Sequence, residues 1–204
     1  MSEGTDTFSP DRDGAGLVGG FADPARDAAH AFRAAMEAMA RPGSLHQVPG
    51  TLPPSPLSQA AGALLLTLVD ADTPLHLAGA ADNAAVRRWV AAQTGAPHVG
   101  PEGAAFALGS WPALCPIDRF PAGTPDYPDR SATLIVEMAE LANRGARLTG
   151  PGIAREAALN LPEIDAFAWN AALFPLGVDV FFCAGRTIAA LPRSTRVDGV
   201  GEGG

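Results

Sequence analysis

The sequence has no lysine, because all 14 of its basic residues are arginine. A Walker A phosphate loop needs a lysine, and so do Schiff-base catalysis and covalently held pyridoxal phosphate. The missing lysine therefore excludes three large classes of enzyme, and we expect the protein to use no cofactor.

Cysteine and histidine are also scarce, with two and four residues. Cys115 and Cys183 lie far apart in the sequence, and we expect both to be reduced, buried thiols that act as small apolar residues. No histidines have the spacing of a zinc motif, so we expect no metal site. His76, near Asp72 at the entry to an expected strand, is the best acid-base candidate.

Charged residues make up only 18% of the chain, and the net charge is -8. An acidic chain lacks the basic face that nucleic acids require, so we expect no nucleic-acid partner. A surface with few charges is suited to burial against another protein. The most continuous apolar run, 60–69, is about half a membrane span, and residues 1–13 lack the apolar core of a secretory signal. We therefore expect a cytoplasmic protein with no membrane segment.

The length of the chain favours one domain. Residues 1–20 are rich in glycine and aspartate, and residues 198–204 are glycine-rich, so both are predicted to be disordered tails. The part between them, 21–197, is predicted to form a single domain.

Asp23 and Pro24 have the pattern of a helix start, an N-cap followed by proline at the first helical position. Ala29, Phe32, Met36 and Met39 then recur at steps of three and four, which predicts an amphipathic helix that ends at 41–43. Further helices are expected at 57–69, at 162–173, and from an N-cap at Asp82 through Val90. Strands are expected at 45–48, 75–78, 105–108, 132–138, 178–183 and 187–191.

The last two strands, 178–183 and 187–191, are predicted to form a hairpin because only a short turn separates them. Residues 147–149 are expected to pair back against 132–138. The proline-rich segment 109–129 is expected to be a long surface connection with one helical turn. Helices interleaved with apolar strands favour the α/β class, with a mixed sheet covered on both faces.

The segment 14–19 has the glycine spacing of a dinucleotide-binding loop, but an acidic tail precedes it where that loop requires a buried strand. We attribute the spacing to linker composition. The segment 70–74 joins a helix to a strand, so it is either a capping turn or part of a site, since sites in α/β sheets gather where loops meet strand ends.

Two segments have the composition of an oxyanion site. Arg147 and Thr149 precede two glycines, whose backbone N–H groups are suited to a phosphate, although the same residues suit a plain turn. Arg193 and Arg196 follow the last strand together with two hydroxyls, which fits either an oxyanion cradle or a solvated strand exit.

Six segments stand out when the chain is taken as a whole. They are Phe32-Arg33 through Met39-Ala40-Arg41-Pro42-Gly43, Leu64-Leu65-Leu66-Thr67-Leu68 with Asp70 and Asp72-Thr73-Pro74, Thr133-Leu134-Ile135, Arg147-Leu148-Thr149-Gly150-Pro151-Gly152-Ile153, Phe174-Pro175-Leu176-Gly177-Val178-Asp179, and Leu191-Pro192-Arg193-Ser194-Thr195. In order and spacing across 24–197, they resemble the PhnH family, whose members are subunits of the bacterial carbon-phosphorus lyase system that acts on phosphonates.

The resemblance implies a three-layer α/β/α sandwich with a mixed sheet, shaped like pyridoxal-phosphate-dependent transferases but without the lysine that holds the cofactor. It also implies a complex with the carbon-phosphorus lyase subunits G, I and J, and a homodimer when the chain is isolated. In that family the complex transfers an alkylphosphonate to C1′ of ATP with release of adenine, which gives ribose 1-methylphosphonate 5-triphosphate. The small-molecule substrates expected are therefore a nucleoside triphosphate and a phosphonate.

Two roles within such a complex remain open. In the first, the chain is an enzyme subunit whose arginines neutralise substrate phosphates. The substrate-binding candidates for this role are Arg147, Thr149, Arg193, Arg196, Asp72 and Asp179. No catalytic residue is assigned. In the second role, the chain is a noncatalytic scaffold that stabilises the complex without binding substrate. Alanine at Arg193 is expected to impair turnover in the first case and to spare it in the second, provided that the complex assembles.

Overall fold

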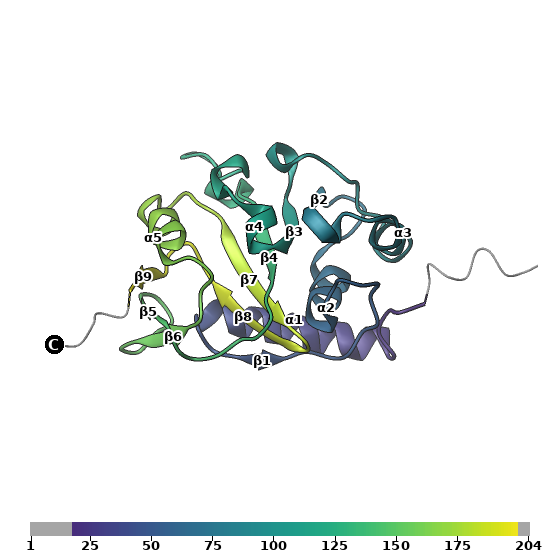
Figure 1. Cartoon of the computed structure of the whole chain (residues 1–204), viewed down its shortest axis with the longest axis horizontal. Coiled ribbons are helices and arrows are strands. Elements are labelled where there is room, and N and C mark those ends of the chain that lie inside the picture. The colour runs from purple at the N-terminus through teal and green to yellow at the C-terminus, as the bar shows by residue number, and fades with distance from the viewer. Residues whose placement is uncertain (1–17, 200–204) are drawn as a thin grey trace, which may run out of the picture.

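The computed structural model describes residues 18–199 and contains helices interleaved with strands (Figure 1). The α-helices are α1 (Pro24–Ala40), α2 (Gln59–Leu68), α3 (Ala84–Gln93), α4 (Trp111–Leu114) and α5 (Ile164–Ala172). The strands are β1 (His46–Gln47), β2 (Leu75–Leu77), β3 (Phe106–Ser110), β4 (Thr133–Glu137), β5 (Ala146–Thr149), β6 (Ala157–Leu159), β7 (Asp179–Ala184), β8 (Thr187–Leu191) and β9 (Arg196–Asp198).

A six-stranded mixed sheet with the strand order β1-β8-β7-β4-β3-β2 forms the centre of the fold. Strands β2, β3, β4 and β7 run parallel, whereas β8 is antiparallel to β7 and β1 is antiparallel to β8. The predicted hairpin of the last two sheet strands is confirmed, and its second strand has the predicted bounds. The four parallel strands are largely apolar because helices and loops cover both of their faces.

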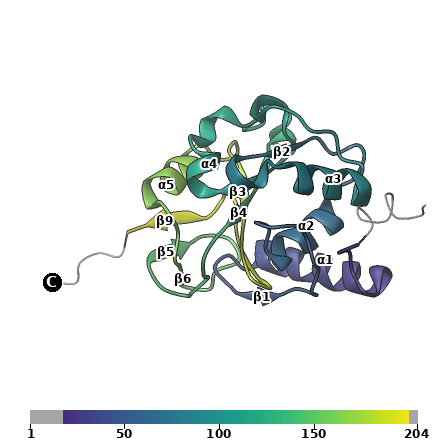
Figure 2. The ribbon, with the colours of Figure 1, turned by 45° about the vertical axis from the view of Figure 1, so that its right-hand side comes forward.

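The sheet divides the interior into two hydrophobic clusters. On one face α1, α2 and α3 pack against alternate strand residues such as Ile135 and Phe181. On the other face the neighbouring residues, such as Leu134 and Phe182, contact α4, α5 and a three-stranded antiparallel sheet of order β6-β5-β9. Figure 2 shows this small sheet beside α5, and its loops reach the C-terminal end of α1. The α/β class with a mixed sheet is therefore confirmed, but the second outer layer includes strands that the sequence did not predict there.

Helix α1 begins as predicted, with the side chain of Asp23 accepting a hydrogen bond from the backbone N–H of Arg26 (3.3 Å) and Pro24 in the first turn. Its buried side, however, consists of alanines, Ala31, Ala34, Ala35 and Ala38. Phe32 and Met36, which belong to the stripe predicted from the sequence, are 50% and 56% exposed. The predicted helix is confirmed, but most of its predicted apolar stripe faces outward. The side that faces the sheet is the alanine side, whose small side chains let the helix lie close to the strands.

The expected pairing of residues 147–149 with 132–138 is wrong. Strand β5 pairs with β6 and β9, whereas β4 pairs with β3 and β7. The turn at 143–145 does not return the chain to β4, because the Asn143 side chain donates to the Ala158 carbonyl (3.1 Å) and the Asn160 side chain accepts from the Ala142 N–H (2.8 Å). These amides join the turn to the small sheet.

The proline-rich segment 109–129 is also more than a surface connection. It contains α4 and short 3-10 turns, and it buries Trp111, Leu114, Ile117 and Phe120 in the second cluster. Its prolines interrupt regular structure, and the apolar residues between them contact the sheet.

Helix α3 is capped by Asn83, not by Asp82 as predicted. The Asn83 side-chain oxygen accepts from the N–H groups of Ala85 and Val86 (both 3.0 Å). Asp82 instead pairs with Arg87, which lowers the pKa of its carboxyl group. Asn and Asp are comparable N-caps, so the sequence alone did not separate two adjacent candidates.

The two predicted tails lie mostly outside the described residues, as does most of the glycine-spaced segment 14–19. At the other end, Asp198 is the last residue of β9. Within residues 18–199, no helix has both the length and the apolar character needed to cross a membrane.

Candidate functional site

Arg193 and Asp179 form an ion pair at the edge of the sheet where the parallel strands begin. Asp179 is the first residue of β7, and Arg193 follows β8. Arg193 Nη2 lies 2.5 Å from Asp179 Oδ2, and the Arg193 Nε and backbone N–H groups donate to Asp179 Oδ1 (3.1 and 2.9 Å). The two side chains are only 14% and 25% exposed.

The remaining donors of Arg193 also bind protein atoms. Nη1 donates to the carbonyl of Pro128 (2.7 Å), and Nη2 donates to the hydroxyl of Ser131. The guanidinium group therefore joins three segments, the start of β7, the loop after β8 and the loop before β4. In this arrangement Arg193 positions the chain that leads into β9, and most of its N–H groups are occupied.

Arg147, Thr149 and Arg196 are brought together on one face of the small sheet. Thr149 lies opposite Arg196, and Arg147 lies opposite Asp198, in the register of β5 and β9. Directly paired residues share a face, so these four side chains project to the same side. The residues between them, Leu148 and Val197, are buried on the other side.

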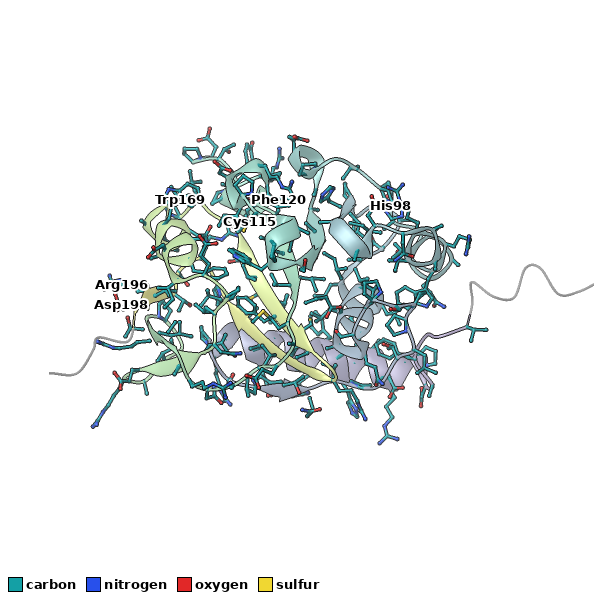
Figure 3. The ribbon with its side chains drawn as sticks, viewed as in Figure 1. His98, Cys115, Phe120, Trp169, Arg196 and Asp198 are labelled. Atoms are coloured by element: carbon teal, nitrogen blue, oxygen red, sulfur yellow. The ribbon has the colours of Figure 1, made fainter. Side chains whose placement is uncertain are left out.

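This face carries charges of both signs. Arg147 Nε lies 3.2 Å from Glu156 Oε2, and both side chains are more than half exposed. The Arg196 side chain makes no ion pair or hydrogen bond with any other residue in 18–199. Figure 3 shows Arg196 and Asp198 at the edge of the molecule. Arg196 is therefore a guanidinium group available to an anion, and Arg147 becomes available when it leaves Glu156.

The glycines of segment 147–152 determine how the predicted motifs meet. A side chain at Gly150 would come within 3.1 Å of the Ser194 carbonyl oxygen, and one at Gly152 within 2.1 Å of the Ala40 carbonyl oxygen. Both glycines have a positive φ, 131° and 81°. The glycines thus allow the loop after β5 to contact the segment before β9 and the end of α1.

Asp72 lies away from the other candidates. It is exposed in the turn before β2, and its backbone N–H donates to Asp70 Oδ1 (3.0 Å). The hydroxyl of Thr73 donates to the same oxygen (2.6 Å), which lowers the pKa of the Asp70 carboxyl group. Strands β3 and β4 separate β2 from β7, so the strand that follows Asp72 lies roughly 14 Å from the strand that begins at Asp179. In this structure 70–74 forms a capping turn.

Glu137 was missed by the sequence reasoning. It closes β4 at the carboxyl end, the edge where open α/β sheets usually bind ligands, and its carboxylate accepts the backbone N–H of Ser58 (2.7 Å) at the start of α2. Burial raises the pKa of the Glu137 carboxyl group, and the hydrogen bonds from Ser58 oppose that shift. An acidic residue at the end of an apolar strand was the available signal. Here the carboxylate acts as a cap for α2.

A pocket of about 260 Å³ opens between α5 and the segment after α4. Trp169, which is 47% exposed, and Cys115 lie on its wall, with Glu163 nearby (Figure 3). Glu163 accepts a hydrogen bond from Trp111 Nε1 (2.9 Å). Burial and the adjacent Glu163 raise the pKa of the Cys115 thiol, so this cysteine is not an activated nucleophile.

Both cysteines are free thiols, but only Cys183 is fully buried, whereas Cys115 is partly exposed. His76 is partly buried, with Nδ1 3.0 Å from the Val99 carbonyl oxygen and its ring near Phe120. These contacts give His76 a structural role in holding the segments around Val99 and Phe120 against β2.

Ser44, His46 and Glu37 have the order of contacts found in a hydrolytic triad, with His46 Nε2 2.7 Å from Ser44 Oγ and Nδ1 3.7 Å from Glu37 Oε2. The Ser44 hydroxyl donates its proton to the Arg41 carbonyl oxygen (2.5 Å), so Nε2 must donate to Oγ. The serine is therefore not activated. The contacts satisfy a carbonyl at the end of α1.

Within residues 18–199, no group of three or more histidine, cysteine, aspartate or glutamate side chains is placed to hold a metal ion.

The fold and these sites define an α/β protein with a mixed sheet, whose arginine-bearing motifs converge on a small second sheet. Residues 19–198 match the family of bacterial phosphonate metabolism proteins (PhnH), and the chain belongs to this family. It is 38% identical over 192 residues to the alpha-D-ribose 1-methylphosphonate 5-triphosphate synthase subunit PhnH of Rhizobium meliloti (strain 1021), covering 88% of this chain and 94% of that protein. It is also 32% identical over 183 residues to the putative C-P lyase subunit protein HtxG of Stutzerimonas stutzeri, covering 82% and 84% of the two chains.

Proposed function

We propose that this chain is a subunit of a cytoplasmic carbon-phosphorus lyase core complex. The complex transfers an alkylphosphonate to C1′ of ATP, displaces adenine and produces ribose 1-methylphosphonate 5-triphosphate. The proposal is supported by the names of the two relatives, one a subunit of the corresponding synthase and the other a putative C-P lyase subunit. Subunits G, I and J are the proposed partners, and the isolated chain is proposed to be a homodimer.

Within that complex, we propose that the face of Arg147, Thr149 and Arg196 contacts substrate phosphate. The observation that carries this step is the register of β5 and β9, which sets Thr149 opposite Arg196 on one exposed face. A guanidinium group can donate two parallel hydrogen bonds to the oxygens of one phosphate, and a hydroxyl adds a further donor. Because the face is open, a neighbouring subunit would have to supply the rest of the pocket.

Arg193 and Asp179 are positioning residues in this proposal. Their ion pair holds the loop that leads to Arg196, so loss of Arg193 would change both stability and the placement of Arg196. Alanine at Arg193 therefore does not separate a substrate role from a scaffold role. Substitution of the exposed Arg147 and Arg196 separates the two roles better, because loss of an exposed side chain leaves the fold intact.

The test is adenine release from ATP and methylphosphonate by the reconstituted complex, with this chain present, omitted or altered. We expect Arg147→Ala with Arg196→Ala to lower turnover about tenfold or more, while the complex still copurifies. Arg144→Ala is the matched control, because Arg144 is also exposed and its one ion pair among residues 18–199 is with the neighbouring Glu140.

A complex whose activity does not depend on this chain would overturn the proposed function. Normal turnover of the Arg147 and Arg196 variant would overturn only the substrate contact. That result would favour the scaffold role, for which the outward apolar stripe of α1 is the specific observation.

A further inference from the structure

The outer side of α1 carries an apolar stripe that nothing in residues 18–199 covers. Its members recur at steps of three and four, and each is exposed: Ala25, Ala29, Phe32, Met36 and Ala40. At 3.6 residues per turn they span an arc of roughly 80°. Phe32 and Met36 are the largest of them, at 50% and 56% exposed, and they line a surface hollow of about 400 Å³. Figure 1 shows α1 running along the lower edge of the molecule.

This stripe is separate from the packing of α1 itself. The helix rests on α2, β1 and β8 through the opposite side, where four alanines are fully or almost fully buried. A helix that is apolar on both sides is expected when it lies between two packed layers. The described structure supplies one of these layers.

Arginines border the stripe. Arg33 and Arg41 line the same hollow as Phe32 and Met36, and Arg26 lies two turns before Arg33 on the same edge. None of the three guanidinium groups makes an ion pair or hydrogen bond with another residue in 18–199. His30 and Glu37 lie on this edge too, and Glu37 faces His46 at 3.7 Å. The edge is therefore positive in a chain whose net charge is -8.

We propose that α1 is a docking surface for an amphipathic helix of another protein in the complex. The apolar side of that helix would lie against Phe32 and Met36, and its carboxylates would face Arg26, Arg33 and Arg41. Phenylalanine, methionine and arginine are enriched at protein interfaces, and the alanines at both ends of the stripe allow two helices to approach closely. This inference rests on the proposed function, because it assumes that the chain works within a complex.

A second copy of this chain fits the surface less well. If two copies of α1 packed antiparallel, with the centres of their stripes in contact, the arginine edge of one helix would lie beside the arginine edge of the other. Arg26 would then lie near Arg41 of the other copy, and the two Arg33 side chains would lie near each other. Like charges placed opposite one another are unfavourable, so the arginine edge favours an acidic partner.

The test measures binding of the full-length chain to the coexpressed G, I and J subunits. We expect Phe32→Glu with Met36→Glu to weaken binding about thirtyfold or more, because the two residues form the centre of the surface. Leu52→Glu is the control, since Leu52 is a more exposed apolar residue (73%) that does not belong to α1 or its stripe, and we expect it to change binding less than twofold. Circular dichroism of each variant verifies that α1 still folds.

The charge requirement is tested separately. Wild-type binding is expected to weaken as sodium chloride is raised, and Arg26→Glu with Arg33→Glu is expected to reduce both the affinity and this salt dependence. Arg144→Glu with Arg155→Glu is the control for the same change in net charge.

Equal binding by the wild type and the Phe32 and Met36 variant would overturn the docking surface but leave the proposed function standing. Failure of the wild type to form any complex would overturn both. An isolated wild-type dimer that the double variant converts to monomer would assign the surface to a second copy. Sedimentation with anionic lipid vesicles that the same variant abolishes would assign it to a membrane.

Discussion

Single side chains in this protein do most of their work by joining segments that are far apart in the sequence. Arg193 is the clearest example, because it bonds Asp179, Pro128 and Ser131 at once. We expect Arg193→Ala to lower the free energy of unfolding by about 2–4 kcal/mol, since Asp179 would remain as a partly buried charge without its partner. Arg144→Ala should change it by less than about 0.5 kcal/mol. Urea denaturation of the isolated chain measures both, and equal stabilities would contradict the role given to Arg193.

Glu137 gives the protein a pH dependence of known sign. Burial raises the pKa of its carboxyl group in the folded protein, so the folded state binds this proton more tightly than the unfolded state does. The resulting stabilisation is complete below the unfolded pKa, for which the ordinary value is 4.5, and is lost as the pH rises through the folded pKa.

Glu137→Gln removes this dependence and keeps an oxygen to accept the Ser58 N–H. We expect the urea midpoint of the wild type, relative to that of the variant, to be higher at pH 5 than at pH 8. A difference that stays constant between the two pH values would show that Glu137 does not titrate in a buried environment.

Secondary-structure elements are held in place by close approaches that only glycine permits. Gly152 adopts a φ of 81° directly beside the Ala40 carbonyl, where an added Cβ would lie 2.1 Å from the oxygen. We expect Gly152→Ala to destabilise the protein by roughly 3 kcal/mol, through both the left-handed backbone and the collision with α1.

Gly185 provides the control for that prediction. It also has a positive φ, 56°, but no atom lies within 4 Å of an added Cβ. Gly185→Ala should therefore cost only the backbone term, about 1–2 kcal/mol. Thermal unfolding of the two variants separates the cost of the left-handed backbone from the cost of the collision with Ala40. Equal melting temperatures would mean that the loop around Gly152 moves away from α1 without cost.

The elements themselves were largely predictable because their signals are local. Periodicity and caps located α1, and the short turn at 184–186 between two apolar runs located the β7–β8 hairpin. The partners of β5 were not predictable in this way. A four-residue strand with one buried face pairs equally well with several neighbours, and its partners β6 and β9 are set by amides and glycines elsewhere in the chain.

The candidate site was predictable only as residue types. The motifs identified Arg193, Arg196 and Arg147 as candidates, and Asp179, another candidate, forms an ion pair with Arg193. Which guanidinium is occupied and which is free depends on tertiary contacts with Pro128 and Ser131, which no sequence pattern encodes. The substrate-binding role of these residues stays a proposal, and the likeness to pyridoxal-phosphate-dependent transferases stays a prediction.

The reactivity of the two thiols tests whether the folded protein stays closed as a whole. Cys183 is fully buried in the central sheet and its pKa is raised well above the ordinary value, whereas Cys115 is partly exposed beside a surface pocket. We expect the native chain to react with one equivalent of a disulfide reagent at pH 8, slowly because the Cys115 pKa is also raised. The second equivalent should react only in denaturant. Cys115→Ser should abolish the native reaction, and a remaining fast phase in that variant would mean that the central sheet opens readily.

The order of the strands has a consequence for the protein during its synthesis. Within residues 18–199, β1 pairs with β8 alone and the second neighbour of β4 is β7, so both pairings require the last part of the chain. In a nascent chain that stops before residue 179, β7 is missing, so β4 has no partner along one of its two long sides. Such an edge can pair with other incomplete chains. We therefore expect nascent chains to be most prone to aggregation before the final hairpin, β7 and β8, is synthesised and completes the sheet.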